Sequence, residues 1–183
     1  MAHGACWFTP PNIFEAGPPR ATMPTKTIGS MKQGTQYIER SAVRVVVTSA
    51  DGERVVIIKA TKGNYYKLPG GGVEGQEDHQ KAAEREVFEE TGAQVSVEGG
   101  CFATVEEFRN DLHQISYCYR GRLLDATGKP ELTEDEMADG LSHEWVPVGE
   151  ALEAMSSLEP TSELGRYIKE RDMFLLAEAL KFA

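Results

Sequence analysis

The stretch GGGVEGQEDHQKAAEREVFEETGA, residues 70–93, runs from three glycines into a short segment crowded with glutamate. Asp78 is a residue type that caps helix N-termini, and Gly92 is typical of the C′ position that ends a helix. We therefore expect a helix from about His79 to Thr91. The glycines before it mark a place where the backbone bends or leaves room for something else.

The acidic end of this helix is not explained by local stability. On a helical wheel Glu86, Glu89 and Glu90 fall within an arc of about 100°, with Ala82 at its centre and space expected above it. Like charges four residues apart repel, and acids in the last turn oppose the helix dipole at ~0.3–1 kcal/mol each. A solvated acidic face is one reading of the cluster. A hard divalent cation, which prefers carboxylate and carbonyl oxygens, is the other.

The segments around this stretch predict a sheet flanked by helices. Residues 41–48 and 54–60 read as strands joined by a turn at Asp51-Gly52, and residues 65–68 as a short strand. Further strands are expected at 95–97, 101–107, 113–123 (half-buried) and 144–146, with an acidic loop at 131–140. Helices are expected at 149–155 and after Ser162. Strands and helices in this mixed order predict an α/β layered sandwich.

Composition and charge exclude several classes of protein. The chain has 183 residues and a net charge of −10, which disfavours non-specific binding of nucleic acid. No apolar run approaches the roughly 20 residues of a membrane span, and no secretory signal is evident. The three cysteines are too few and too widely spaced for a disulfide framework or a zinc site. A reducing compartment, the cytoplasm, fits this pattern best.

The chain divides near residue 37. Residues 1–37 hold five of the nine prolines and show no helical or strand period, so we expect a flexible tail. Part of it could lie on the domain through Trp7, Phe8, Ile13 and Phe14. Residues 38–183 form the expected domain, in which the final helix caps the fold. A monomer or a homodimer fits these features.

The spacing within residues 71–93 resembles the signature of the Nudix hydrolases. Gly71, Glu77, Arg85-Glu86, Glu89-Glu90 and Gly92 fill its invariant positions, and Leu68-Pro69-Gly70 before them is also similar to the family. Two positions depart from the usual pattern: Ala93 replaces a bulky aliphatic residue, and Gln76 replaces a glycine. The resemblance implies a Nudix-type α/β/α sandwich with a mixed sheet.

The resemblance also implies a mechanism. Nudix enzymes use divalent cations to cut a pyrophosphate linkage in a nucleoside diphosphate joined to some other group, so Mg²⁺, or Mn²⁺, is the expected cofactor. By position, the implied metal ligands are Glu86, Glu89, Glu90 and the Gly70 carbonyl, while Arg85 orients the glutamates and Glu77 ties loop to helix. The general base is Glu86 or Glu89, or an acid on a distant loop. Candidates of that second kind are Glu107, Glu134, Glu136 and Asp139, with Glu136 preferred.

The substrate is encoded less directly. Tyr65, Lys67 and Arg44 lie near the glycines and are the candidate substrate-binding residues; a tyrosine here could stack on a base. Within the family, the end of the domain is most similar to hydrolases of nucleoside triphosphates, including oxidised ones. The triple glycine followed by Val73-Glu74 also resembles diphosphoinositol polyphosphate and mRNA-cap hydrolases. A non-catalytic Nudix-like nucleotide-binding module is the alternative of another class.

Overall fold

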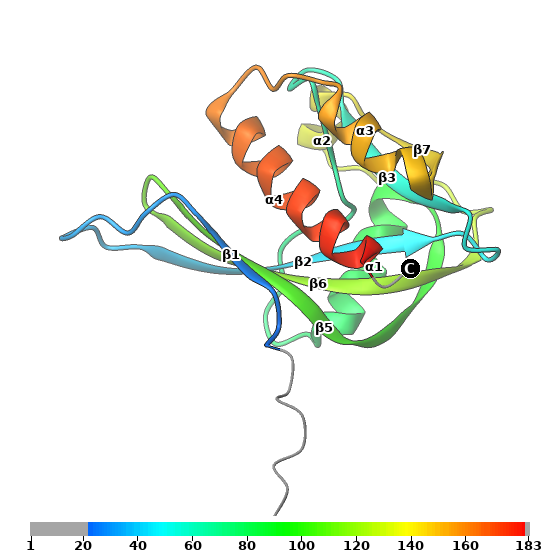
Figure 1. Ribbon diagram of the computed structural model, residues 1–183, viewed down its shortest axis with the longest axis horizontal. Helices are drawn as coiled ribbons and strands as arrows, with labels where there is room; N and C mark the ends of the chain where they lie inside the picture. Colours follow the sequence, from blue (N-terminus) through cyan, green and yellow to red (C-terminus); the bar gives the residue numbers. More distant parts are fainter. Residues whose placement is uncertain (1–21, 182–183) are drawn as a thin grey trace, which may run out of the picture.

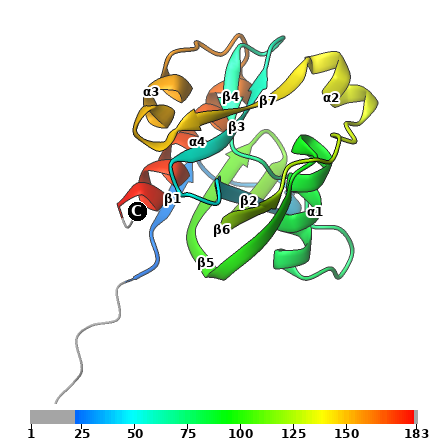
Figure 2. The same ribbon diagram turned by 90° about the vertical axis from the view of Figure 1, so that its right-hand side faces the viewer.

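A mixed sheet lies between helices in the computed structural model, which describes residues 22–181 (Figures 1 and 2). The strands are β1 (Thr25–Ile28), β2 (Ile38–Thr48), β3 (Arg54–Ala60), β4 (Tyr65–Lys67), β5 (Gln94–Arg109), β6 (Leu112–Asp125) and β7 (Leu141–Pro147). The helices are α1 (His79–Thr91), α2 (Glu134–Asp139), α3 (Ala151–Ser156) and α4 (Glu163–Leu180), with a 3₁₀ turn η1 at Val148–Glu150.

The strands pair in the order β1-β5-β6-β2-β3-β4, and β7 also pairs with β3. β2 runs parallel to β6 over its whole length, whereas β5 and β6 form a long antiparallel hairpin. The contact between β2 and β3 is brief, with Thr48 opposite Val55. The sheet therefore opens beside β2, and this opening positions the site described below.

Two apolar layers hold the helices on the sheet. On one face Val43, Val45 and Val47 of β2 pack with Ala83 and Val87 of α1. On the other face the core includes Met155 of α3 and Leu175, Leu176 and Ala179 of α4. Alternate residues of a strand point to opposite faces, so the continuous β-branched run of β2 fits a strand that is covered on both sides. The predicted α/β/α sandwich is confirmed.

The folded part of the chain begins earlier than residue 38. Thr25–Ile28, which the sequence interpretation placed in the tail, form the edge strand β1 and pair in parallel with β5 from Thr104 to Glu107. Four residues are too few to show a clear period, and their pairing partner is about 80 residues away. Residues 1–21, including Trp7, Phe8, Ile13 and Phe14, lie outside the described residues.

Three local predictions need correction. Residues 131–140 are not a simple loop, because Thr133 and Glu136 form a capping box that starts α2. The strands predicted at 95–97 and 101–107 are one strand, β5, with an irregularity between Glu98 and Ala103. Strand β6 is covered on both faces rather than half-buried: Ser116 and Cys118 are buried toward the α4 side, while Tyr119 is buried toward α1.

No helix within residues 22–181 is long and apolar enough to cross a membrane.

Candidate functional site

Helix α1 has the predicted boundaries, and its ends are capped as expected. The Asp78 carboxylate accepts a hydrogen bond from the Gln80 backbone at 2.8 Å. Gly92 adopts a left-handed conformation, with φ of 70°, and its N–H donates to the Phe88 carbonyl at 2.7 Å. These caps fix where the last turn lies, and the acids are on that turn. One detail differs: Ala82, expected on the open acidic face, is fully buried against the sheet.

The glycine loop runs along the free edge of β2. The backbone N–H groups of Val43 and Val45 donate to the carbonyls of Gly71 and Pro69, at 2.9 and 3.0 Å. Gly70 has a φ of 134°, and a Cβ there would collide with the Val43 carbonyl, so only glycine fits. A Cβ on Gly71 would overlap the Glu86 carboxylate. The two glycines thus let the loop pass between β2 and α1 while Glu86 lies against it.

Arg85 is the centre of the acidic cluster. Its guanidinium donates to Glu77 at 2.6 Å, to Glu86 at 3.0 Å and to Glu89 at 2.9 Å. It also donates to the Gly72 carbonyl at 3.1 Å, which ties helix to loop. The hydrogen bond that Arg85 donates to Glu77 is the largest of several contributions that raise the Arg85 pKa above its ordinary value. Arg85 thus contacts all three glutamates, and its implied role in orienting them stays a prediction.

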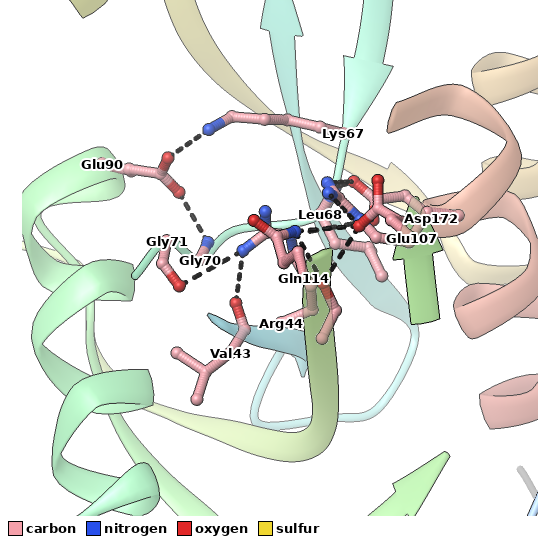
Figure 3. Close-up of polar contacts among 12 residues, drawn as sticks. Val43, Arg44, Lys67, Leu68, Gly70, Gly71, Glu90, Glu107, Gln114 and Asp172 are labelled. Atoms are coloured by element: carbon pink, nitrogen blue, oxygen red, sulfur yellow. Dashed lines mark hydrogen bonds and ion pairs between the residues drawn. The ribbon is translucent and has the colours of Figure 1, made fainter. Parts of the chain in front are cut away.

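Glu90 belongs to a different environment. It is buried, and its two oxygens accept from Lys67 Nζ at 2.5 Å and from the Gly70 N–H at 2.8 Å (Figure 3). Glu86 is only partly buried, and burial followed by repulsion from Glu90 raises its pKa. Glu89 is the most exposed of the three, with 38% of its side-chain area accessible. Solvent exposure therefore increases across the cluster, from Glu90 in a buried ion pair to the solvated carboxylate of Glu89.

The donor set suits a hard divalent cation. Three carboxylates and a backbone carbonyl are the oxygen ligands that Mg²⁺ and Mn²⁺ prefer. Pro69 and Gly71 carbonyls are used by β2, whereas the hydrogen bonds found within residues 22–181 do not use the Gly70 carbonyl. As they stand, Arg85 and Lys67 hold the glutamates apart, and no group of three metal-ligating side chains in the described part of the chain is already gathered. Seating a cation requires these glutamates to exchange contacts with Arg85 and Lys67.

Two adjoining cavities lie beside these acids. One, of about 530 Å³, is lined by residues of the loop, α1 and the segment leading into α2, including Arg85, Glu86 and Glu89. The other, of about 270 Å³, extends between β2, β5, β6 and α4. They share Arg40, Gly71, Glu86 and Glu136. A small ligand can therefore touch the acidic cluster and reach into the second cavity.

A buried polar network forms one wall of the smaller cavity. Asp172 of α4 accepts from Arg171 Nε at 2.6 Å and from the Leu68 N–H at 3.0 Å. Glu107 of β5 accepts from Gln114 at 2.8 Å and from Arg171 at 3.3 Å. Burial acts to lower the Arg171 pKa, but the two acids offset it and the pKa lies above its ordinary value. Through Leu68, which follows β4, this network ties α4 to the start of the glycine loop.

The structure brings together only some of the predicted distal acids. Glu107 and Glu136 line the smaller cavity. Glu136 is in part engaged, because one of its oxygens accepts from the Thr133 backbone and hydroxyl, each at 2.9 Å. Asp139 instead pairs with Lys62 at the surface, and Glu134 lines neither cavity.

Only two of the three predicted substrate-binding residues lie at a cavity. Arg44 and Lys67 line the smaller cavity, but Tyr65 lines neither cavity. Tyr65 is buried instead: its ring packs against Gly63 and Gly165, so closely that a Cβ at either glycine would collide with it. The alternation of a three-residue strand could not show which face Tyr65 takes. Sequence reasoning missed Arg40, Arg109 and Arg171, since nothing in the local sequence marks an arginine as part of a cavity.

Comparisons with known proteins agree with this geometry. A family model described as "NUDIX domain" matches residues 38–164. Diphosphoinositol polyphosphate phosphohydrolase 3-beta of Bos taurus is 28% identical over 124 residues, which are 68% of this chain and 73% of that protein. The human 3-alpha protein is 27% identical over the same shares.

Solved structures show the same fold at lower identity. A NUDIX hydrolase from Nitrosomonas europaea superposes with a TM-score of 0.60 at 16% identity, covering 79% of this chain and 90% of that one. The signature, the sandwich and the matched range point to one conclusion. The chain belongs to the NUDIX domain family and is a Nudix hydrolase.

Proposed function

We propose that the protein is a divalent-cation-dependent enzyme that hydrolyses a pyrophosphate linkage in a small, highly anionic phosphate compound. One observation carries the proposal: Glu86 and Glu89, held by Arg85, line a cavity that adjoins a second one with five basic residues in its wall. The carboxylates suit cations, and the basic wall suits phosphates. A chain with a net charge of −10 needs such a local cluster to attract an anionic ligand.

Glu86, Glu89, Glu90 and the Gly70 carbonyl would hold the metal. When bound, Mg²⁺ or Mn²⁺ neutralises charge on phosphate oxygens and lowers the pKa of a coordinated water. Before a cation binds, Arg85 keeps Glu86 and Glu89 beside the cavity through its bonds to them, and these contacts rearrange when the carboxylates take the metal. The reaction forms one bond from the water oxygen to phosphorus and breaks the bond from phosphorus to the bridging oxygen, which leaves with the electron pair.

We propose Glu89 as the group that takes the proton from the attacking water. Arg85 contacts only one of its oxygens, Oε2, and the side chain is partly open to solvent. Glu136 is the second candidate, since it lines both cavities beside Glu86. Glu107 is less suitable because Gln114, Ser116 and Arg171 already donate to the same oxygen of this buried carboxylate.

Among substrates, a densely phosphorylated compound such as a diphosphoinositol polyphosphate ranks first. The residues that line the two cavities include no aromatic side chain, so this part of the described chain offers no platform for a nucleobase. Diphosphoinositol polyphosphate phosphohydrolases are also among the similar curated proteins. A nucleoside triphosphate, ordinary or oxidised, is the other candidate, and capped RNA is a third; the sequence alone favours the nucleotide.

The test is an assay of phosphate or pyrophosphate release with Mg²⁺ and with Mn²⁺. The panel holds diphosphoinositol polyphosphates, ordinary and oxidised nucleoside triphosphates, dinucleoside polyphosphates, sugar nucleotides and capped RNA. We expect turnover of a diphosphoinositol polyphosphate that disappears with EDTA. Binding of a panel member without hydrolysis of any would contradict the proposal and favour a binding module, while turnover of nucleotides alone would reverse the ranking of substrates.

Compartment and assembly are further parts of the proposal. Cys101 and Cys118 are free thiols in the described residues, as in a reducing compartment such as the cytoplasm. A monomer or a homodimer is proposed from the final helix, whose apolar side packs on the core. Light scattering after size-exclusion chromatography tests the assembly, and particles larger than a dimer would contradict it.

A further inference from the structure

The smaller cavity has an unusual charge for this chain. Five of its lining residues are basic: Arg40, Arg44, Lys67, Arg109 and Arg171. Four are acidic: Glu86, Glu90, Glu107 and Glu136. The whole chain carries ten more acids than bases, so this wall is a local reversal of the overall balance. A bound divalent cation at Glu86 would make the reversal larger.

Three of these basic groups already have partners. Lys67 is paired with Glu90, and Arg171 is enclosed by Asp172 and Glu107. Arg40 donates to the Gln114 side chain at 2.9 Å. Their contacts account for their positions without any ligand.

Arg44 and Arg109 differ from these three. Within residues 22–181, the buried side-chain nitrogens and oxygens that lack a hydrogen-bond partner are Arg44 Nε and Arg109 Nε, and both belong to the wall of this cavity. Arg44 is 94% buried, since its exposed fraction is 6%. Such atoms are rare in folded proteins, and a ligand is one of their standard explanations.

The acid nearest to Arg44 cannot satisfy it. Arg44 Nε lies 3.8 Å from Asp172 Oδ1, beyond hydrogen-bond distance, and Asp172 already accepts from Arg171 and Leu68 (Figure 3). Arg44 Nη1 donates to the Val43 carbonyl at 2.5 Å, a neutral acceptor. Burial, and then repulsion from Arg171, lowers the Arg44 pKa to about 10. An anion in the cavity would relieve both effects.

The two arginines project from the same face of the sheet but from separate positions. Arg44 is opposite Cys118, which is opposite Ala103, and Arg109 follows Ala103 by an even number of residues. Six residues of strand separate their backbone positions by roughly 20 Å. Both side chains line the same cavity, so they approach it from different ends. A ligand that contacts both must therefore carry anionic groups at separate points.

We propose that Arg44 and Arg109 bind two separate phosphoryl groups of one small polyanionic ligand, apart from the carboxylates of α1. This site deepens the proposed function, because it selects substrates that carry phosphates besides the pyrophosphate that is cut. Arginine suits this task, since its planar fork of donors matches phosphate oxygens. Arg44 and Arg109 are specificity-determining residues in this account and take no part in bond cleavage.

The test measures binding without turnover. Isothermal titration calorimetry in EDTA gives the Kd of the full-length protein for inositol hexakisphosphate and for inorganic phosphate. We expect inositol hexakisphosphate to bind at least roughly tenfold more tightly, because it alone can reach both arginines. Arg109→Gln and Arg44→Lys should each weaken its binding by roughly tenfold or more, as expected for lost charge-assisted hydrogen bonds. Arg44→Lys keeps the buried charge, and thermal melting checks that both variants fold.

The matched control is Arg122→Gln. Arg122 lies on β6, pairs with Glu98 at 2.9 Å and lines neither cavity. The control variant therefore loses one arginine charge, as Arg109→Gln does, but loses it at the surface. An unchanged Kd for this control supports the site. Equal losses in all three variants, wild-type Kd values in both cavity variants, or no measurable binding of inositol hexakisphosphate would each overturn it. Because no hydrolysis is measured, an inactive hydrolase that still binds this probe would refute the proposed function alone.

Discussion

Arg85 and Arg44 lie on opposite sides of the glycine loop, and they differ in the hydrogen-bond acceptors that surround them. Arg85 is partly exposed, yet Glu77, Glu86, Glu89 and the Gly72 carbonyl all accept from it. Arg44 is deeply buried, yet it has only carbonyl acceptors and a distant Asp172. A fully bonded arginine is a structural part of a site. A buried, poorly bonded one requires an explanation, and the ligand proposed above supplies it.

The largest expected effect comes from the acids that Arg85 holds. Glu89→Gln should lower kcat by roughly a hundredfold or more, because a lost metal ligand or base costs several kcal/mol in the transition state. Steady-state kinetics with Mg²⁺ and a melting curve measure activity and fold. Glu84→Gln, on the same helix but bonded to the Val97 backbone, is the control and should keep its activity. Near-normal turnover of Glu89→Gln would remove Glu89 from the mechanism.

The second prediction concerns the buried network behind Arg44. Asp172→Ala leaves Arg171 and Arg44 without their main acid, so the free energy of unfolding should fall by ~3–5 kcal/mol. Urea denaturation measures the change. Glu170→Ala, two residues before it on α4 but in an exposed pair with Lys26, should cost only ~0–1 kcal/mol. Equal costs for the two variants would show that the network does not hold α4 in place.

The variant Lys67→Met tests whether a metal ion takes the place of the Lys67 ammonium group beside Glu90. Lys67→Met leaves the buried Glu90 carboxylate without its cation, so we expect Mn²⁺ to bind roughly tenfold more tightly, a gain of ~1.4 kcal/mol. Electron paramagnetic resonance of free Mn²⁺ gives the Kd without substrate. Lys62→Met removes an exposed lysine that pairs with Asp139 and should leave the Kd unchanged. A weaker or unchanged Kd for Lys67→Met would mean that Glu90 is not a metal ligand.

The smallest effect, a pH-dependent difference in Tm, is expected at His113, which is far from both Arg85 and Arg44. Burial acts to lower its pKa, but hydrogen bonds to Glu106 and Glu39 outweigh this and raise it. A raised pKa adds stability that is complete below the unfolded pKa of about 6.5 and is lost as pH rises through the folded value. The difference in Tm between wild type and His113→Gln should therefore shrink from pH 6 to pH 8. A difference that grows with pH would contradict the assignment.

Sequence reasoning succeeded where short-range chemistry decides the structure. The caps Asp78 and Gly92 fixed the ends of α1, and β-branched runs fixed β2 and β3. It failed where distant parts of the chain decide. Strand β1 exists only through β5, and the acid nearest to Arg44, Asp172, comes from α4, more than 120 residues away. The spacing of Thr133 and Glu136 already indicated the start of α2, but this signal was missed among the many acids of the segment.

The central claim is that the carboxylates of α1 seat divalent cations against a pyrophosphate. Crystals soaked in Mn²⁺ with inorganic pyrophosphate, measured at the manganese absorption edge, test it most directly. The account predicts anomalous peaks within coordination distance of Glu86 and Glu89, with the Arg85 contacts rearranged. Crystals in which Arg85 and Lys67 keep their present bonds to the glutamates, with no anomalous peak beside them, would contradict it.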